Sequence, residues 1–167
     1  MSLDPTILAL LAGPIAISAA GRDSDLRPSV AHAYGCRVVA GGEAIRIFLL
    51  RDEARQVLAD IAANGEVATV YSDVRSFRSL QIKGHDARIV AFDTEDAAYR
   101  AAYFRITSQE LLALGHAPGL AQGYFSVPEM ADFATVTFTP GEIFQQTPGP
   151  GAGAKLERDA KLAGSAA

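Results

Sequence analysis

The sequence predicts a mainly β protein, a split antiparallel β-barrel with helices packed outside it. Six apolar runs have the character of strands, and most consecutive runs are joined by short turns. Short connections favour antiparallel pairing, whereas a doubly wound sheet needs a helix between most strands. The chain has 167 residues, 49% of them hydrophobic, which is enough for one compact core. We therefore expect one domain over residues 1–153, followed by a polar tail over residues 154–167.

The first part of the chain is predicted to form one short helix and three strands. Asp4 is a suitable N-cap, Pro5 suits the first helical position, and Gly13 ends the helix. Strands are expected over residues 14–20, 28–40 and 44–50, the second with an irregularity or bulge at Gly35 and a turn after it at Gly41–Gly42.

A helix is predicted over residues 51–64. At 100° per residue, its apolar side holds Ala54, Val57, Leu58 and Ile61, and its polar side holds Asp52, Glu53, Gln56 and Asp60. Arg51 and Arg55 lie together along one border of the apolar stripe. Asn64–Gly65 predicts a left-handed cap at the end of this helix.

The second half is predicted to alternate strands and helices. Strands are expected over residues 66–73, 79–92 and 134–144, the middle one bent at Gly84. Two helices are expected, one over residues 94–106 that begins at Asp93 or Thr94, and one over 109–115 that Ser108 caps. Residues 116–128 are expected to form an irregular loop.

Composition excludes several classes of protein. The net charge is −4, with 15 basic and 19 acidic residues, which argues against a nucleic-acid-binding domain. The apolar stretch near the N-terminus has no basic residue before Arg22 and is broken by Gly13 and Pro14, so we expect neither a signal peptide nor a membrane span. Cys36 is the only cysteine, so it forms no intrachain disulfide and no cysteine zinc site. We expect a cytoplasmic protein in which Cys36 is a small core residue.

The sequence has no strong catalytic or metal-binding motif. GxGxxG, the P-loop, HExxH and GxSxG are all absent. His32, His85 and His116 lie far apart without metal-ligand spacing, so a structural or surface role is favoured for each and no metal site is predicted.

The arginines are more informative. Arg51 and Arg55 are four residues apart near a helix N-terminus, where unpaired N–H groups and the helix dipole favour an anion. A guanidinium adds a planar fork that suits phosphate. On spacing alone, pairing with neighbouring acids at the edge of the core is the favoured alternative. Further arginines on or beside the predicted strands are expected to converge in part on one cleft: Arg27, Arg37, Arg46, Arg75 and Arg78.

Four segments, in their order along residues 13–153, resemble the pyridoxamine 5′-phosphate oxidase-like family of FMN-binding split β-barrels. They are GCRV (35–38), ANGEVATVY (63–71), RSLQIKG (78–84) and QTPGPGAG (146–153). The resemblance implies FMN at the interface of a homodimer, with its phosphate held by the second barrel strand and the start of the helix. The FMN-binding residues that it implies are Arg51, Arg55, Gln56, Ser79, Ser29 and His32.

The sequence also departs from the enzyme that gives the family its name. That enzyme has Ser-Arg-Lys at the helix start, where this chain has Arg55, Gln56 and Val57. The chain has no tryptophan and no Arg-x-His near its end, so oxidation of pyridoxamine 5′-phosphate is not expected. The prediction is a flavin-dependent oxidoreductase acting on an unknown small molecule, as a homodimer that binds neither nucleic acid nor membrane. The alternative is a non-enzymatic flavin- or haem-binding protein for storage or sensing.

Overall fold

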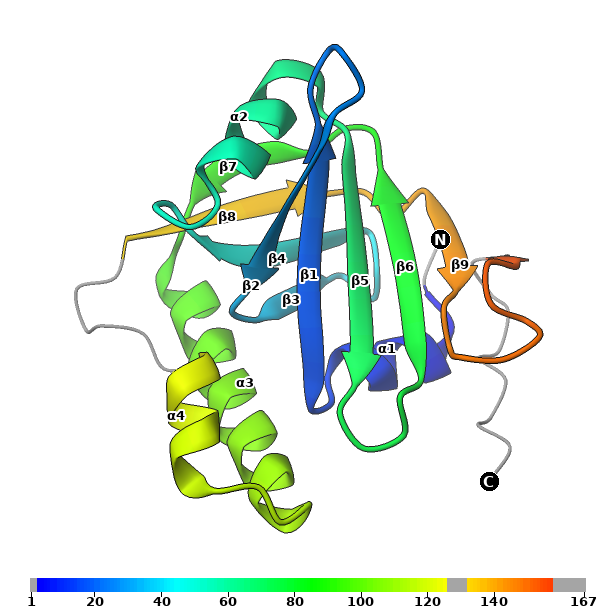
Figure 1. The fold of residues 1–167 in the computed structure, drawn as a ribbon. Helices are drawn as coiled ribbons and strands as arrows, with labels where there is room; N and C mark the ends of the chain where they lie inside the picture. The colour runs from blue at the N-terminus through cyan, green and yellow to red at the C-terminus, as the bar shows by residue number, and fades with distance from the viewer. Residues whose placement is uncertain (1–2, 126–131, 158–167) are drawn as a thin grey trace.

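Two antiparallel sheets form the body of the molecule in the computed structural model, which describes residues 3–125 and 132–157. The larger sheet has the strand order β10-β9-β6-β5-β1-β2 and the smaller one β3-β4-β8-β7. Figure 1 shows the two sheets turned across each other, with the helices around them. The strands are β1 Ile15–Arg22, β2 Pro28–Ala33, β3 Cys36–Val39, β4 Ala44–Leu50, β5 Val67–Asp73, β6 Ser79–Gly84, β7 Arg88–Ala91, β8 Phe133–Phe138, β9 Glu142–Gln145 and β10 Lys155–Leu156. The predicted mainly β class with peripheral helices is confirmed.

Three of the predicted long strands are each divided between the two sheets. The run 28–40 breaks at Tyr34–Gly35 into β2 and β3, the run 79–92 breaks after Gly84 into β6 and β7, and the run 134–144 breaks into β8 and β9. The predicted bulge at Gly35 is therefore a change of sheet, at a backbone φ of 137° that favours glycine. At Gly84, an added Cβ would lie 2.6 Å from Cδ2 of Phe138, so a side chain has no room where the two sheets meet.

The first two helices are α1 Pro5–Leu11 and α2 Arg55–Asn64. The predicted cap of α1 is confirmed, because Asp4 Oδ1 accepts a hydrogen bond from the Thr6 N–H at 2.7 Å. The left-handed cap at Gly65 is also confirmed, with φ of 71°. The predicted start of α2 at residue 51 is wrong. Residues 51–53 form a turn, and the Ala54 N–H donates to Leu50 O at 2.9 Å before the helix begins.

The remaining helices are α3 Thr94–Ala113 and α4 Pro118–Phe125. The two helices predicted on either side of Ser108 are one continuous helix, because residues 94–113 contain no glycine or proline to end it. The predicted loop over 116–128 is wrong for residues 118–125, which form α4, and residues 126–128 lie outside the described chain. Pro118 at the first position favours a helix start, whereas Gly119 and Gly123 give the segment the composition of a loop.

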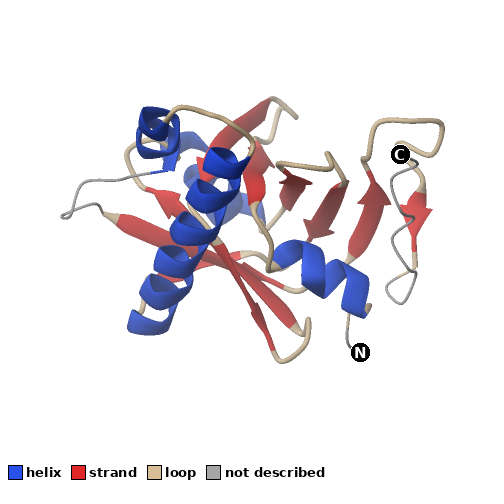
Figure 2. Cartoon of the chain, turned by 90° about the horizontal axis from the view of Figure 1, so that it is seen from below, coloured by secondary structure: helices blue, strands red, loops and turns tan. Residues whose placement is uncertain are grey.

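The core fills the space between the sheets, and Figure 2 shows the helices at their periphery. Its large and almost fully buried members include Ile7, Ile15, Ile17, Ile45, Ile47, Leu49, Ile61, Tyr71, Leu80, Ile82 and Val136. Cys36 belongs to this core as expected, and burial raises the pKa of its thiol to about 12. No helix in the described part of the chain combines the length and apolar character needed to cross a membrane.

Candidate functional site

Helix α2 lies against β1 and β2, and this arrangement brings together several residues that the sequence singled out. Asp60 lies on the side of α2 that faces the strands, and only 4% of its surface is exposed. Its carboxylate accepts hydrogen bonds from two of these residues. Ser29 Oγ donates to its Oδ2 at 2.5 Å, and Gln56 Nε2 donates to its Oδ1 at 2.8 Å. Gly21 makes the close approach possible, since a Cβ there would lie 3.0 Å from the Asp60 Cβ.

The hydrogen bonds to Asp60 occupy the side chains of Ser29 and Gln56. Both polar groups already satisfy a buried carboxylate, and they join the helix to the strand. A carboxylate in this position also repels a phosphate. The expected role of Ser29 and Gln56 as flavin ligands therefore stays a prediction, and the contacts within the protein give each of them a structural role.

Arg51 and Arg55 lie on the outer side of the same helix start. Arg51 is in the turn before α2, where its Nε is 3.2 Å from Asp132 Oδ1. Arg55 is exposed and donates to the Asp52 carbonyl at 3.1 Å, and it forms no ion pair with an acid in the described part of the chain. The N-cap residue Ala54 provides no side-chain cap, and the first turn contains no acid. The start of α2 therefore has no side-chain cap and carries the exposed Arg55, while Asp52 and Glu53 precede it in the turn. An uncapped helix end beside an arginine suits an anion.

Ser79 lies apart from these residues within one chain. It begins β6, and β5 and β1 lie between β6 and β2 in the sheet. The side chain is buried, with its Oγ 2.8 Å from Ser72 Oγ and 2.9 Å from the Phe77 carbonyl. Its backbone N–H donates to Thr147 Oγ1 at 3.0 Å. A single chain thus does not combine Ser79 with Arg55 in one site.

A second group of residues surrounds His32 where β2 ends. The rings of His32 and Tyr34 are 4.9 Å apart edge to face, and the Tyr34 ring is 5.9 Å from that of Phe133. Tyr34 Oη donates to Glu53 Oε2 at 2.8 Å. The Arg100 guanidinium from α3 lies 5.5 Å from the Phe133 ring centroid. We call these five residues the His32 cluster, and Glu53 places it beside the start of α2.

The titratable groups of the His32 cluster have shifted pKa values. Burial lowers the pKa of His32, although Glu53 opposes this effect. Burial and the hydrogen bond to Glu53 raise the pKa of Tyr34 to about 12. Burial lowers the pKa of Arg100. Several shifted groups beside aromatic side chains are characteristic of binding and catalytic sites.

Sequence reasoning had selected His32 but not its neighbours. The one local signal was that His32 and Tyr34 are two residues apart and so share one face of a strand. Glu53, Arg100 and Phe133 come from distant parts of the chain, and only the fold brings them to this strand.

Most of the other arginines pair with acids of the same chain. Arg37 and Arg46 both form ion pairs with Asp96 at the start of α3, and Arg37 is almost fully buried. Arg27 pairs with Asp25 in its own hairpin turn, and Arg75 pairs with Glu110. The expected convergence of some of these arginines on one cleft stays a prediction. Arg37 and Arg46 do meet, at Asp96, and acids of the same chain pair with four of the five arginines.

The lowered pKa of His32 predicts a dependence of stability on pH. The unfolded chain takes up a proton near the ordinary value of 6.5, before the folded protein does. The free energy of unfolding should therefore fall as the pH decreases from about 7 to about 5, and His32→Gln should reduce this slope. Urea unfolding at several pH values measures both slopes. If the free energy of unfolding changes with pH equally in the wild type and in His32→Gln, other titratable groups cause the pH dependence.

Comparison with known proteins identifies the fold. No family model and no curated protein sequence matches the chain. A candidate pyridoxamine 5′-phosphate oxidase from Lactobacillus delbrueckii has a similar structure, with a TM-score of 0.52 and 16% identity, covering 86% of this chain and 93% of that one. The match shows the split-barrel fold of that protein and confirms the architecture expected from the resemblance.

Two further solved structures show weaker similarity. One is a pyridoxamine 5′-phosphate oxidase-related, FMN-binding protein from Nostoc punctiforme, with a TM-score of 0.49 and 14% identity, covering 90% of this chain and 89% of that one. The other is the haem storage protein HutZ from Vibrio cholerae, with a TM-score of 0.48 and 17% identity, covering 87% and 95%.

Proposed function

We propose that this protein binds FMN and acts as a flavin-dependent oxidoreductase on a small molecule. The observation that carries the proposal is the uncapped start of α2 with the exposed Arg55, which lies beside the His32 cluster. Arg55, which forms no ion pair within the described residues, and the uncapped first turn of the helix suit the phosphate of FMN. The split-barrel fold shared with a candidate pyridoxamine 5′-phosphate oxidase supports the same reading.

The residues of the chain would have separate roles in this site. Arg55 and the first turn of α2 bind the phosphate, and Arg51 adds positive charge. Tyr34 keeps its proton at neutral pH and donates it in the hydrogen bond to Glu53, while the lowered pKa of His32 favours its neutral form. Arg100 favours negative charge near the ring of Phe133. FMN, when bound, supplies the hydride chemistry itself.

The proposal does not extend to pyridoxamine 5′-phosphate as the substrate. A phosphorylated amine needs a second cationic site beyond the one that binds the flavin phosphate. The chain has no tryptophan and no Arg-x-His near its end, and Arg37 and Arg46 are used in ion pairs with Asp96. A different small molecule fits these residues better.

Arg55→Ala tests the phosphate site directly. The change removes one charge-assisted contact, and we expect the affinity for FMN to fall by about tenfold to a hundredfold, or about 1.5–3 kcal/mol. Arg27→Ala is the matched control, because Arg27 is an exposed arginine in the turn between β1 and β2. Titration with FMN, followed by flavin fluorescence, measures all three proteins. Equal affinity of wild type and Arg55→Ala for FMN would show that the flavin phosphate does not bind at the start of α2.

The homodimer is a further part of the proposal. The outer face of β2, β1 and β5 carries small and apolar side chains: Ala16, Ser18, Ala20, Val30, Ala68, Val70 and Ser72. Val30 is 72% exposed on this face. A smooth face of this kind suits a second copy of the chain. The partner copy could also supply the Ser79 that a single chain keeps away from Arg55.

Sedimentation velocity tests the homodimer. We expect a dimer at micromolar concentration and a shift to monomer in Ser18→Glu, because Ser18 lies between Val70 and His32 in the middle of this face and a buried charge there repels its symmetry mate. Ser24→Glu, in the exposed turn between β1 and β2, is the control. A monomeric wild type would contradict an FMN site that is shared between two copies of the chain.

A further inference from the structure

His32 belongs to the sheet face that the proposed homodimer buries. In the register of β2 and β1 it pairs with Ser18, which pairs on its other side with Val70 of β5. Side chains directly opposite each other on antiparallel strands lie on the same face of the sheet. His32 is half-buried in a single chain, so part of its ring remains open on this face. A second copy packed against the face would cover the rest of the ring.

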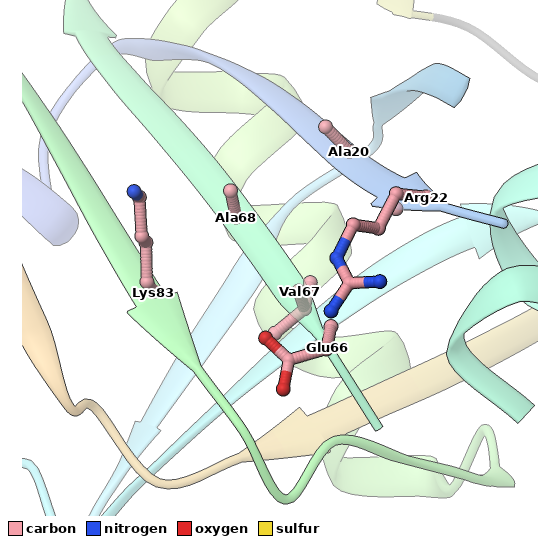
Figure 3. A pocket seen from close by; sticks show the side chains of 7 residues that line it. Ala20, Arg22, Glu66, Val67, Ala68 and Lys83 are labelled. Carbon is pink, nitrogen blue, oxygen red and sulfur yellow. The ribbon is translucent and has the colours of Figure 1, made fainter. Parts of the chain in front are cut away.

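The charged side chains of this face lie at one end of it. Figure 3 shows that end, where Arg22, Glu66 and Lys83 lie around Ala68. Glu66 Oε2 is 2.9 Å from His85 Nδ1. The small and apolar side chains nearer the centre of the face carry no charge. Because imidazole is the ordinary side chain that changes its charge between about pH 5 and about 8, a mild acid change at the centre of the face falls on its histidine.

Three titratable groups join His32 in its cluster. The Tyr34 ring on the same strand is 4.9 Å away, and the turn before α2 contributes Glu53, which accepts the hydrogen bond from Tyr34. Helix α3 contributes Arg100. The buried Asp60 of α2 is on the opposite face of β2. Glu53 raises the pKa of His32 and burial lowers it by more, so a single chain already favours the neutral ring.

We propose that His32 makes the homodimer sensitive to acid, so that the two copies separate when its ring is protonated. The inference rests on the proposed homodimer. A second copy removes water from the ring, and burial disfavours the charged form. A two-fold interface also contains His32 twice, and two protonated rings near its centre repel each other. The monomer therefore binds protons more readily than the dimer, and acid shifts the equilibrium toward monomer. An FMN site shared between two copies is then lost in acid.

Sedimentation equilibrium of the full chain without FMN, at pH 7.5 and pH 5.5, tests the proposal. We expect the dissociation constant of the wild-type dimer to be about tenfold or more higher at pH 5.5 than at pH 7.5. His32→Gln, which keeps a neutral polar side chain, should show nearly the same constant at both pH values. His85→Gln is the matched control, because His85 is the exposed histidine at the charged end of the face, and it should keep the wild-type increase. Near-UV circular dichroism at both pH values checks that each protein stays folded.

Four results would overturn the inference. Equal dissociation constants of the wild type at both pH values would leave the homodimer standing without the acid response. An increase that His32→Gln keeps, or that His85→Gln loses, would assign the response to another group. Unfolding of the wild type at pH 5.5 would make dissociation a consequence of the lost fold. A monomeric wild type at both pH values would remove the homodimer as well, whereas FMN titration at pH 7.5 reports on the flavin site separately.

Discussion

Replacing Asp96 with alanine is expected to lower the free energy of unfolding by about 3–5 kcal/mol. Asp96 is fully buried at the start of α3. It accepts hydrogen bonds from Arg46 Nε at 2.9 Å, from Arg46 Nη2 at 2.6 Å and from Thr135 Oγ1 at 2.8 Å, and it forms an ion pair with Arg37 Nε at 3.2 Å. Without the carboxylate, two largely buried guanidinium groups lose their central acceptor.

The control for Asp96 is on the same helix. Glu95 also pairs with Arg37, but its side chain is 68% exposed, so Glu95→Ala should cost about 1 kcal/mol or less. Urea unfolding of the wild type and both variants gives the free energies. Similar losses for Asp96→Ala and Glu95→Ala would show that the buried network contributes little.

The Asp96 network also predicts how stability changes in acid. Burial alone would raise the pKa of Asp96, and the hydrogen bonds from Arg46 and Thr135 outweigh burial, so the pKa is below its ordinary 3.8. Stability from this carboxylate is therefore present above about pH 3.8 and is lost as the pH falls through the folded pKa. Asp96→Ala should flatten the decrease in stability between about pH 5 and about pH 2.

Phe48→Ala is expected to cost about 3–5 kcal/mol, the second largest effect on stability. Phe48 is fully buried in β4, with its ring 5.4 Å from that of Phe92 and its Cδ2 against Gly35. Its backbone accepts from the Tyr34 N–H at 2.8 Å and donates to Gly35 O at 3.1 Å, where the chain passes from one sheet to the other. The change would leave a cavity beside the His32 cluster.

Phe77→Ala is the matched control for Phe48→Ala. Phe77 is 67% exposed in the turn between β5 and β6, so its removal should change the free energy of unfolding by about 0.5 kcal/mol or less. Chemical unfolding measures both variants. If Phe48→Ala is no more destabilising than Phe77→Ala, the contact between the sheets at Gly35 is not important for the fold.

Local signals in the sequence predicted most of the elements. The Asp4–Pro5 pair and Asn64–Gly65 indicated helix ends correctly, because capping depends on residues within one turn. The sequence predicted a bulge at Gly35 and a bend at Gly84 but not that the chain changes sheet at these positions. The changes of sheet depend on contacts with Phe48 and Phe138, which lie elsewhere in the chain.

The candidate site could be predicted only in part. The spacing of Arg51 and Arg55 indicated a positively charged segment, but the turn that delays the start of α2 depends on a backbone hydrogen bond from Ala54 to Leu50. Asp60 has the sequence position of a solvent-facing residue, and it is buried because Gly21 and Ser29 make room for it. The pairing of Asp60 with Ser29 joins residues 31 positions apart, and local patterns do not contain it.

The central claim is that this chain binds FMN at the start of α2, and calorimetric titration of FMN into the purified protein tests it most directly. We expect one FMN bound per chain, a yellow complex with flavin absorption, and weaker binding in Arg55→Ala than in Arg27→Ala. An absence of FMN binding, or a Soret band from haem in the purified protein with no response to FMN, would contradict the proposal.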